Sequence, residues 1–379
     1  MERTLCQTVH VEVLLKDIRH KQNEEYLKQV ALKCIHGVEK LQRLEFHFYH
    51  LEEERGEEED LDEDGGSAAA LHWLLPNREF HGLWDSLVFG SPVKEKLLSY
   101  MKSALMFADH GVDGHLINLN KVVLLHGPPG TGKTSLCKAL AQKLTIRLSH
   151  RYKYGQLIEI NSHSLFSRWY SESGKLVLKM FEKIKEMMDN PDAVVFILID
   201  EVESLAAARA AAIAGSDPSD SLRVVNALLT QLDQIRRYPN ILILSTSNLT
   251  GAIDVAFVDR ADVKLYIGPP PKGVIEKTEG DLFPMVEPGA TVMNTETEKL
   301  WEISRKSEGV SGRSVRKLPF LAHTLLDASS AVTLTEFLNA LNSALEHMKI
   351  SYLVTLSCAV KLDPVTVVEA KRAVDVTVR

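Results

Sequence analysis

The sequence predicts an α/β fold in which a parallel sheet is flanked by helices. Short apolar runs alternate with helical stretches through the middle of the chain, and this alternation is typical of parallel strands joined by helices. The first apolar run also leads into a glycine-rich turn that opens a helix, as in phosphate-binding loops. We expect strands at 122–126, 157–160, 193–199, 241–245 and 263–267, and helices at about 133–144, 173–188 and 219–236.

The glycine-rich turn reads GPPGTGKT and fits the pattern G-x-x-x-x-G-K-[ST]. Its glycines let backbone N–H groups curl around phosphates where a Cβ atom would obstruct them. Lys133 would place its charge on the β- and γ-phosphates, and the Thr134 hydroxyl would ligate Mg²⁺. The alternative is a turn of purely structural use. We predict that a nucleoside triphosphate is bound by Gly127, Pro128, Pro129, Gly130, Thr131, Gly132, Lys133, Thr134 and Ser135.

Polar residues follow two of the expected strands, where open α/β sheets bind their ligands. In the run FILIDE, we expect Asp200 to hold Mg²⁺, directly or through water, and Glu201 to polarise the attacking water. Desolvating two adjacent acids is costly without a cation, which favours this interpretation. Asn248 follows the next strand and would hold the lytic water or sense the γ-phosphate, although an asparagine at this position is otherwise a turn former.

Two arginines further along the chain fit roles at the γ-phosphate. Arg260 would reach as a finger into a neighbouring subunit's site and neutralise developing charge. The alternative is a surface ion pair with Asp259 or Asp262. Arg313, which follows GVSG, would contact the γ-phosphate from a small helical lid and couple the lid angle to the nucleotide state. The alternative is a helix start with basic residues on its exposed face.

Trp169 and Tyr170 lie in a polar, glycine-bounded loop, where large aromatic side chains are poorly explained as core. If six subunits form a ring, this loop would line the central pore and grip a polypeptide; otherwise the two aromatics pack on the subunit's own surface. The stretch 206–220, small and flexible, is a second candidate pore element. Upstream, Leu87 or the next residue would pack on the base, while Trp84 equally suits core or domain-boundary packing.

The composition suits a soluble globular protein: of 379 residues, 45% are hydrophobic and 25% charged, enough for two or three domains. The apolar run at 193–199 is far too short to span a bilayer, and the N-terminus lacks the pattern of a secretory signal, so no membrane partner is expected. The four cysteines are scattered without a C-x-x-C pair. We therefore expect reduced thiols in the cytosol or nucleus rather than a disulfide framework or a zinc site.

The net charge of −7 is concentrated in one segment. Residues 52–64 contain ten acids and one arginine, hence −9, so the rest of the chain carries +2. We expect this segment to be a solvated, flexible linker and, secondarily, a partner-binding tail. With no broad basic surface, sequence-specific nucleic-acid binding is not expected. Ahead of the linker, Val9, Val11 and Val13 alternate as in a half-buried strand, and a helix is expected around 24–41.

The motifs GPPGTGKT, FILIDE, STSN and SGR, in this order, resemble those of AAA+ ATPases. Longer stretches, among them LIEINSHSLFSRWYSESGKL and RKSEGVSGRSVRKLPFLAH, resemble the pachytene checkpoint protein 2 (thyroid receptor-interacting protein 13) family over about 71–271 and 301–345. The resemblance implies a homohexamer that uses ATP and Mg²⁺ to open closed HORMA-domain proteins presented by a HORMA-like adaptor. It also implies roles in spindle-checkpoint silencing and in meiotic recombination and chromosome-axis control. The implied location is the nucleus and cytoplasm, with association to chromosomes and kinetochores.

The same resemblance assigns roles and domains. By motif, the family's roles fall on Lys133 and Thr134 (nucleotide and Mg²⁺), Asp200 and Glu201 (hydrolysis), Asn248 (first sensor), Arg260 (finger), Arg313 (second sensor) and Trp169 (pore). The expected domains are a shortened N-terminal client- or adaptor-binding domain at 1–50, the acidic linker at 51–70, the large ATPase domain at 71–271, the lid at 272–349 and an atypical tail at 350–379.

Some segments depart from the family's pattern. Residues 272–299 are polar and interrupted by Pro284, Pro288 and Gly289, and the tail from residue 350 is rich in Val and Thr and favours strand over helix. Other protein classes share the phosphate loop. Initiators and clamp loaders would need a basic groove or a helix-turn-helix module, and neither is evident. Small-molecule phosphotransferases would not need the sensor and finger motifs, and an inactive scaffold is a further alternative.

Overall fold

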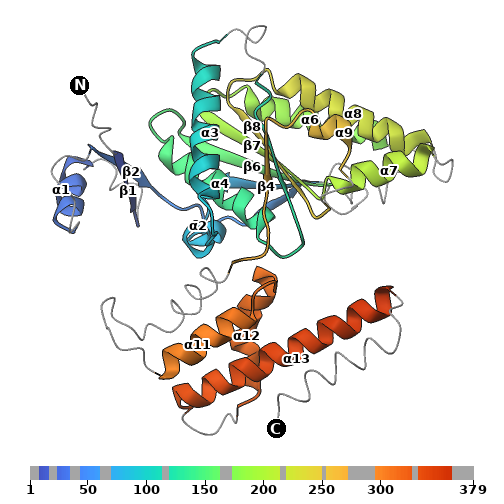
Figure 1. Cartoon of the computed structure of the whole chain (residues 1–379). Coiled ribbons are helices and arrows are strands. Elements are labelled where there is room, and N and C mark those ends of the chain that lie inside the picture. Colours follow the sequence, from blue (N-terminus) through green and yellow to red (C-terminus); the bar gives the residue numbers. More distant parts are fainter. Residues whose placement is uncertain are drawn as a thin grey trace, which may run out of the picture. The chain divides into compact units, whose positions relative to one another are not determined.

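The computed structural model describes ten segments of the chain, which belong to two compact units (Figure 1). The larger unit comprises Met1–Leu87 with Ser91–Gly268, and the smaller unit comprises Val88–Gly90 with Pro269–Arg379. The described residues are 8–16, 24–34, 43–59, 70–112, 119–162, 173–213, 219–249, 253–271, 295–326 and 332–360. The predicted nucleotide loop lies in the larger unit and the predicted lid in the smaller one.

A seven-stranded sheet forms the centre of the larger unit, with the strand order β3-β4-β6-β7-β8-β5-β9. The five neighbouring strands β6, β7, β8, β5 and β9 run parallel to one another. At one edge, β4 pairs antiparallel with β6, and β3 pairs antiparallel with β4. The strands are β3 (Glu57–Glu59), β4 (Ala70–Leu75), β5 (Val122–His126), β6 (Tyr154–Asn161), β7 (Ala193–Asp200), β8 (Ile241–Ser247) and β9 (Val263–Tyr266). The structure thus confirms the five predicted strands and adds an antiparallel edge that the sequence does not predict.

Helices cover both faces of this sheet. They are η2 (Arg78–Phe80), α2 (Leu83–Ser86), α3 (Val93–Asp109), α4 (Lys133–Arg147), α6 (Ser173–Met188), α7 (Glu203–Ile213), α8 (Ser219–Ile235) and α9 (Val255–Val258). Figure 1 shows α6, α7 and α8 on one side of the sheet and α3 and α4 on the other. Strand β7 is fully buried over residues 193–199, as expected for a central parallel strand. Its Ile197 and Ile199 pack in one cluster with Phe181 of α6 and Leu228 of α8.

Helix α7 corrects the expectation that residues 206–220 are flexible. The segment from Glu203 to Ile213 is helical because it is rich in alanine, which has the highest intrinsic helix propensity. Arg209 of this helix also forms an ion pair with Asp254, with 3.0 Å between Nη1 and Oδ2. Residues 214–218 lie outside the described residues, so a pore role of this segment stays a prediction.

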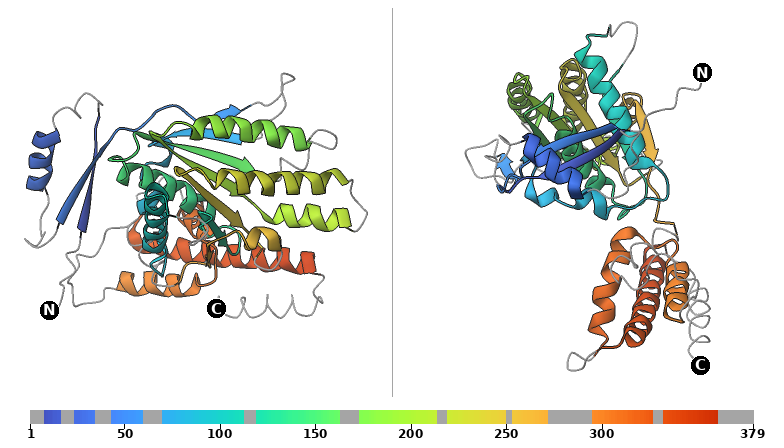
Figure 2. Two further views of the ribbon diagram at one scale, coloured as in Figure 1. Left: turned by 90° about the horizontal axis from the view of Figure 1, so that it is seen from above. Right: turned by 90° about the vertical axis from the view of Figure 1, so that its left-hand side faces the viewer.

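The N-terminal segment forms a small βαβ element, which contains the strand that the alternating valines predict, the predicted helix and a second strand that the sequence does not predict. Strands β1 (Thr8–Leu14) and β2 (Arg43–Tyr49) pair in parallel, with α1 (Glu24–Cys34) between them in the chain. The described helix ends at Cys34, earlier than predicted, and residues 35–42 lie outside the described residues. Figure 2 shows this element from two further directions. Glu12 of β1 binds α4, with 2.6 Å to Lys143 Nζ and 3.2 Å to Arg147 Nε.

The first part of the acidic segment has a paired backbone, which corrects the prediction of a flexible linker for the residues described, while the side chains of residues 53–55 and 57 are exposed, as predicted for a solvated segment. Glu57–Glu59 forms β3 against β4, and Glu52 forms a backbone bridge with Asn77. Gly56 allows the segment to lie close to β4, because a Cβ atom on residue 56 would lie 2.5 Å from the Trp73 ring. Backbone pairing at the sheet edge and a glycine contact therefore outweigh the repulsion of neighbouring carboxylates. Residues 60–69 lie outside the described residues.

The smaller unit is helical, as predicted for the lid. Its helices are α11 (Thr295–Lys306), α12 (Gly312–Thr324) and α13 (Leu334–Val360), and Ile303, Leu318 and Leu341 from the three helices share one buried cluster. Helix α13 continues to Val360, so the prediction of strand from residue 350 is wrong for residues 350–360. These residues extend a helix that begins at Leu334 and contains no Gly or Pro. Extending a formed helix is favourable enough to override the weak strand preference of Val and Thr. In the described part of the chain, no helix is both long and apolar enough to cross a membrane.

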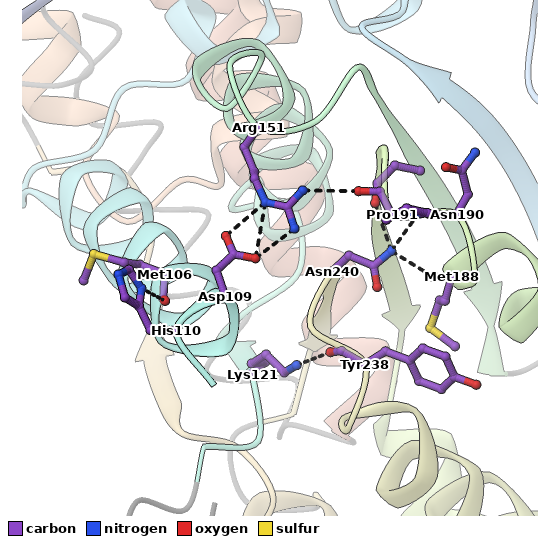
Figure 3. Close-up of polar contacts among 11 residues, drawn as sticks. Met106, Asp109, His110, Lys121, Arg151, Met188, Asn190, Pro191, Tyr238 and Asn240 are labelled. Carbon is purple, nitrogen blue, oxygen red and sulfur yellow. Dashed lines mark hydrogen bonds and ion pairs between the residues drawn. The ribbon is translucent and has the colours of Figure 1, made fainter. Parts of the chain in front are cut away.

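The amino ends of the central strands, opposite the predicted site, are joined by the amide of Asn240 (Figure 3). Its Nδ2 donates to the carbonyl oxygens of Met188 and Ala193 at 3.0 Å and of Asn190 at 3.2 Å. Asn240 is 3% exposed, so water cannot replace these hydrogen bonds. This side chain therefore ties the turn before β7 to the start of β8.

Two further contacts hold the same end of the sheet (Figure 3). The Arg151 guanidinium binds Asp109 at the end of α3, with 3.0 Å between Nη2 and Oδ1. The Lys121 ammonium, just before β5, donates to the carbonyl oxygen of Tyr238. The loops at this end are thus fixed, and the opposite, carboxyl end carries the polar residues predicted to act.

We predict that Asn240→Ala lowers the free energy of unfolding by about 2 kcal/mol, because it leaves buried carbonyl oxygens without a donor. Urea denaturation followed by circular dichroism measures the change. Asp189→Ala, at an exposed position directly before the same turn, is the matched control and should change stability by less than about 0.5 kcal/mol. Equal effects of the two substitutions would show that the Asn240 hydrogen bonds do not stabilise this end of the sheet.

Candidate functional site

The loop between β5 and α4 has the backbone shape of a phosphate cradle. Gly127 has φ 144°, and a Cβ atom on it would lie 2.2 Å from the carbonyl oxygen of Ile267, so no other residue fits. Gly132, with φ 90°, caps the start of α4 without any side-chain hydrogen bond to the first helical N–H groups. The first N–H groups of α4 are therefore available to an anion.

The Lys133 side chain curls back over this loop. Its ammonium donates to the carbonyl oxygens of Gly127 at 2.9 Å and Pro128 at 2.8 Å, and the residue is 4% exposed. The Thr131 hydroxyl also donates to Pro128 at 3.0 Å, which closes the turn. The positive charge is thus held inside the cradle, where it would meet phosphate oxygens.

The two predicted Mg²⁺ ligands touch each other. The Thr134 hydroxyl, at the start of α4, lies 3.0 Å from Oδ1 of Asp200, at the end of β7. The Thr246 hydroxyl of β8 donates to the same carboxylate, and Ser162 donates to the Asp200 carbonyl oxygen at 2.8 Å. Hydroxyl and carboxylate oxygens are the hard donors that Mg²⁺ prefers, so the cradle and this pair together fit a triphosphate with Mg²⁺.

Glu201 directly follows Asp200 in the chain, but its backbone conformation differs from that of the strand. Its φ of 57° is left-handed, a conformation that non-glycine residues adopt rarely and that clusters at functional sites. The Ser204 hydroxyl stabilises the turn by donating to the Glu201 carbonyl oxygen at 2.5 Å. Asp200 is half-buried and hydrogen-bonded, whereas Glu201 is exposed. Two adjacent carboxylates thereby occupy different environments, one suited to a cation and one to water.

Asn248 lies just beyond β8, the strand between β5 and β7 in the sheet. Its backbone N–H donates to Oε1 of Glu203 at 3.1 Å, which connects it to the first turn of α7. The structure therefore brings Asn248 to the same edge of the sheet as the phosphate loop and Asp200. Glu203 was not predicted, and its only sequence signal is its place two residues after Glu201.

His126, like Glu203, lies at the site and was not predicted from the sequence. It ends β5 immediately before the loop, its Nδ1 is buried without a partner among the described residues, and its ring lies 5.6 Å from that of Tyr266. Burial, and secondarily the Lys133 charge, lowers the pKa of His126, so the ring is neutral near pH 7. A neutral ring here adds no charge of its own beside the phosphate loop.

Arg260 is held within its own chain by Asp233 of α8. The two side chains form a bidentate pair, Nε–Oδ1 3.0 Å and Nη2–Oδ2 2.7 Å, and this hydrogen bonding raises the pKa of Arg260. The predicted alternative, a surface ion pair of Arg260 with Asp259 or Asp262, is wrong. Asp262 instead accepts hydrogen bonds from the Lys121 N–H at 2.7 Å and other groups before β5. The finger role of Arg260 stays a prediction.

The other predicted residues fall elsewhere. Trp169 and Tyr170 belong to residues 163–172, which lie outside the described residues. Arg313 is exposed in the first turn of α12, in the smaller unit, where Ser311 caps the helix by accepting from the Ser314 N–H at 3.2 Å. The structure confirms the helix start, and the sensor role of Arg313 stays a prediction.

Leu87 is the described candidate for packing on a base. It is buried, and its Cδ2 lies 3.3 Å from the position of a Cβ on Gly132, which places it beside the phosphate loop. Trp84 instead packs with cations, its ring lying 4.9 Å from Lys94 Nζ and 5.7 Å from Lys143 Nζ. The packing alternative for Trp84 is thus favoured, and contact of Leu87 with a base stays a prediction.

Two families match separate parts of the chain. The ATPase family associated with various cellular activities (AAA) matches residues 123–269, and the TRIP13-like AAA+ ATPase lid C-terminal domain matches residues 278–349. The pachytene checkpoint protein 2 homolog of Gallus gallus is 56% identical over 324 residues, which cover 79% of this chain and 74% of that protein. The homolog of Homo sapiens is 55% identical over 325 residues, with the same shares covered.

Solved structures agree with these matches. The structure of C. elegans PCH-2 superposes with a TM-score of 0.73 and 32% identity over 90% of this chain and 99% of that chain. A chain of the E. coli MS115-1 HORMA:CdnC:Trip13 complex gives a TM-score of 0.58 at 20% identity, over 72% of this chain and 94% of that chain, which shows a shared fold. Together, these matches confirm the predicted fold class.

We predict that Glu201→Gln lowers the rate of ATP hydrolysis at least a hundredfold, because an amide cannot accept a proton from water. Nucleotide binding should be retained, since the exposed Glu201 lies outside the cradle and the Mg²⁺ pair. Phosphate release and binding of a fluorescent ATP analogue measure the two properties separately. Glu182→Gln, at an exposed position of α6, is the matched control. Hydrolysis by Glu201→Gln at the parental rate would remove Glu201 from the mechanism.

Proposed function

Because the chain belongs to the pachytene checkpoint protein 2 family of AAA+ ATPases, we propose that it uses ATP hydrolysis to open closed HORMA-domain proteins. The observation that carries the proposal is the contact of Thr134 with Asp200 beside the exposed Glu201. It supports a cation site at Thr134 and Asp200 and a general base at Glu201, next to the phosphate loop.

ATP supplies the phosphoanhydride bond, and its Mg²⁺ supplies charge that offsets the charge developing on the phosphates. Lys133 and the first N–H groups of α4 hold the phosphate oxygens, while Thr134 and Asp200 hold the cation. Glu201 takes the proton of the attacking water, and Asn248 orients that water from the neighbouring strand. Each of these residues sits on a sheet end or helix start, so little movement is needed to assemble them.

The coupling of hydrolysis to remodelling rests on a ring of six copies. In this proposal Arg260 of one subunit reaches the γ-phosphate of its neighbour, which requires it to exchange the Asp233 carboxylate for phosphate oxygens. Arg313 reports the nucleotide state through the smaller unit. Trp169 and Tyr170 line the central pore and pull on the client. The family resemblance of the motifs supports these roles.

The proposed clients are HORMA-domain proteins presented by a HORMA-like adaptor. A chain of the same fold was solved in the E. coli HORMA:CdnC:Trip13 complex, which makes HORMA proteins the first clients to test. The proposed roles are silencing of the spindle checkpoint and control of meiotic recombination and the chromosome axis. The proposed location is the nucleus and cytoplasm, at chromosomes and kinetochores.

Opening of the client is tested with a purified closed HORMA protein, its adaptor and ATP, and hydrogen exchange of the client's closing segment reports the closed state. We predict that the parental chain accelerates loss of protection and that Trp169→Ala abolishes this effect while basal hydrolysis survives. Trp301→Ala, at an exposed position of α11, is the matched control. Normal opening by Trp169→Ala would contradict the pore role, and no opening by the parental chain would contradict the proposed function.

A further inference from the structure

A cluster of histidine and glutamate side chains lies on the small N-terminal sheet, away from the nucleotide loop in the sequence. In the parallel register, His10 is opposite Glu45 and Glu12 is opposite His47. Because alternate residues of a strand share a face, all four side chains lie on one face of β1 and β2. Neither the ATPase mechanism nor the family matches, which begin at residue 123, use this cluster.

Three members of the cluster bring ligand atoms together. His10 Nδ1 lies 3.0 Å from His47 Nε2 and 3.5 Å from Oε2 of Glu45, and all three atoms lie within 4.8 Å of one another. Around a tetrahedral zinc ion with bonds of about 2.0 to 2.1 Å, ligand atoms are about 3.3 Å apart. The two distances lie on either side of that value, so small side-chain rotations would seat an ion.

We propose that His10, Glu45 and His47 bind a Zn²⁺ ion on the N-terminal sheet. Two imidazole nitrogens and one carboxylate oxygen are the ligand set of open zinc sites, which leave a fourth position to water. Within the described part of the chain, no other group of three His, Cys, Asp or Glu residues holds its ligand atoms this close. The proposal does not depend on the client or the adaptor.

Accessibility and charge also fit an ion. The His47 side chain is buried, that of His10 is 19% exposed and that of Glu45 is 36% exposed, so the site opens to solvent on the Glu45 side. Burial lowers the pKa of both rings, to about 4 for His47, so both nitrogens are neutral ligands near pH 7. The nearby charges of Arg147 and Lys102 oppose a cation, and Glu12, which pairs with both Arg147 and Lys143, offsets only part of this positive charge.

The alternative is a pair of stacked histidines that only stabilises the sheet, since the two rings are 5.2 Å apart and share a hydrogen bond. A structural pair would not bind metal, whereas a zinc site requires all three ligands. The two interpretations therefore differ in stoichiometric metal binding, which is measured without ATP or client.

Co²⁺ replaces Zn²⁺ as a spectroscopic probe, because tetrahedral Co²⁺ absorbs visible light strongly whereas hydrated Co²⁺ does not. Titration of the full chain should saturate at one ion per chain, lose the band on addition of Zn²⁺, and lack the near-ultraviolet absorption of thiolate ligands. Glu45→Gln, at a half-exposed position, should weaken binding at least tenfold, and His47→Ala should abolish it.

His110→Ala, on the exposed end of α3, is the matched control and should leave the titration unchanged. Circular dichroism of each variant confirms folding. The proposal is overturned if the parental chain shows no saturable visible band, or if Glu45→Gln and His47→Ala bind Co²⁺ as the parental chain does. A band accompanied by thiolate absorption would place the ion on cysteines and would also overturn it.

Discussion

The contact between the Thr134 hydroxyl and the Asp200 carboxylate is the interaction on which the proposed chemistry depends. The two residues are 66 positions apart, and the strand order brings them together. β8 lies between β5 and β7, so the carboxyl ends of three neighbouring parallel strands present the phosphate loop, Asn248 and Asp200 side by side. A one-residue shift in any of these strands would turn the functional side chain to the other face of the sheet.

The opposite end of the sheet provides the rigidity that this arrangement needs. Asn240 and the Arg151–Asp109 pair fix the loops there with hydrogen bonds to buried carbonyl groups and to a neighbouring helix. The phosphate loop itself is shaped by close contacts, since Gly127 lies against the backbone of Ile267. The site is thus positioned by contacts at both ends of the sheet, while Glu201, among the predicted site residues, combines a left-handed backbone with an exposed side chain.

Local signals explain which parts of the fold and the site the sequence predicts. Buried parallel strands read as continuous apolar runs, and the phosphate loop requires glycine at fixed spacings, so both are visible without a structure. Long-range pairings are not visible: β4 joins the sheet only through β6, and Arg260 finds Asp233 on another helix rather than its acidic neighbours. The helix through residues 350–360 is missed because a continuing helix outweighs residue preference.

The central claim is that hydrolysis at this site is coupled to a HORMA client. The most direct test is the steady-state ATPase rate of the purified chain, measured with and without a closed HORMA protein and its adaptor. The account predicts turnover by the chain alone and a higher rate when both proteins are present. An ATPase rate that does not change when the two proteins are added would contradict the account. So would a rate no higher than that of the Glu201→Gln variant.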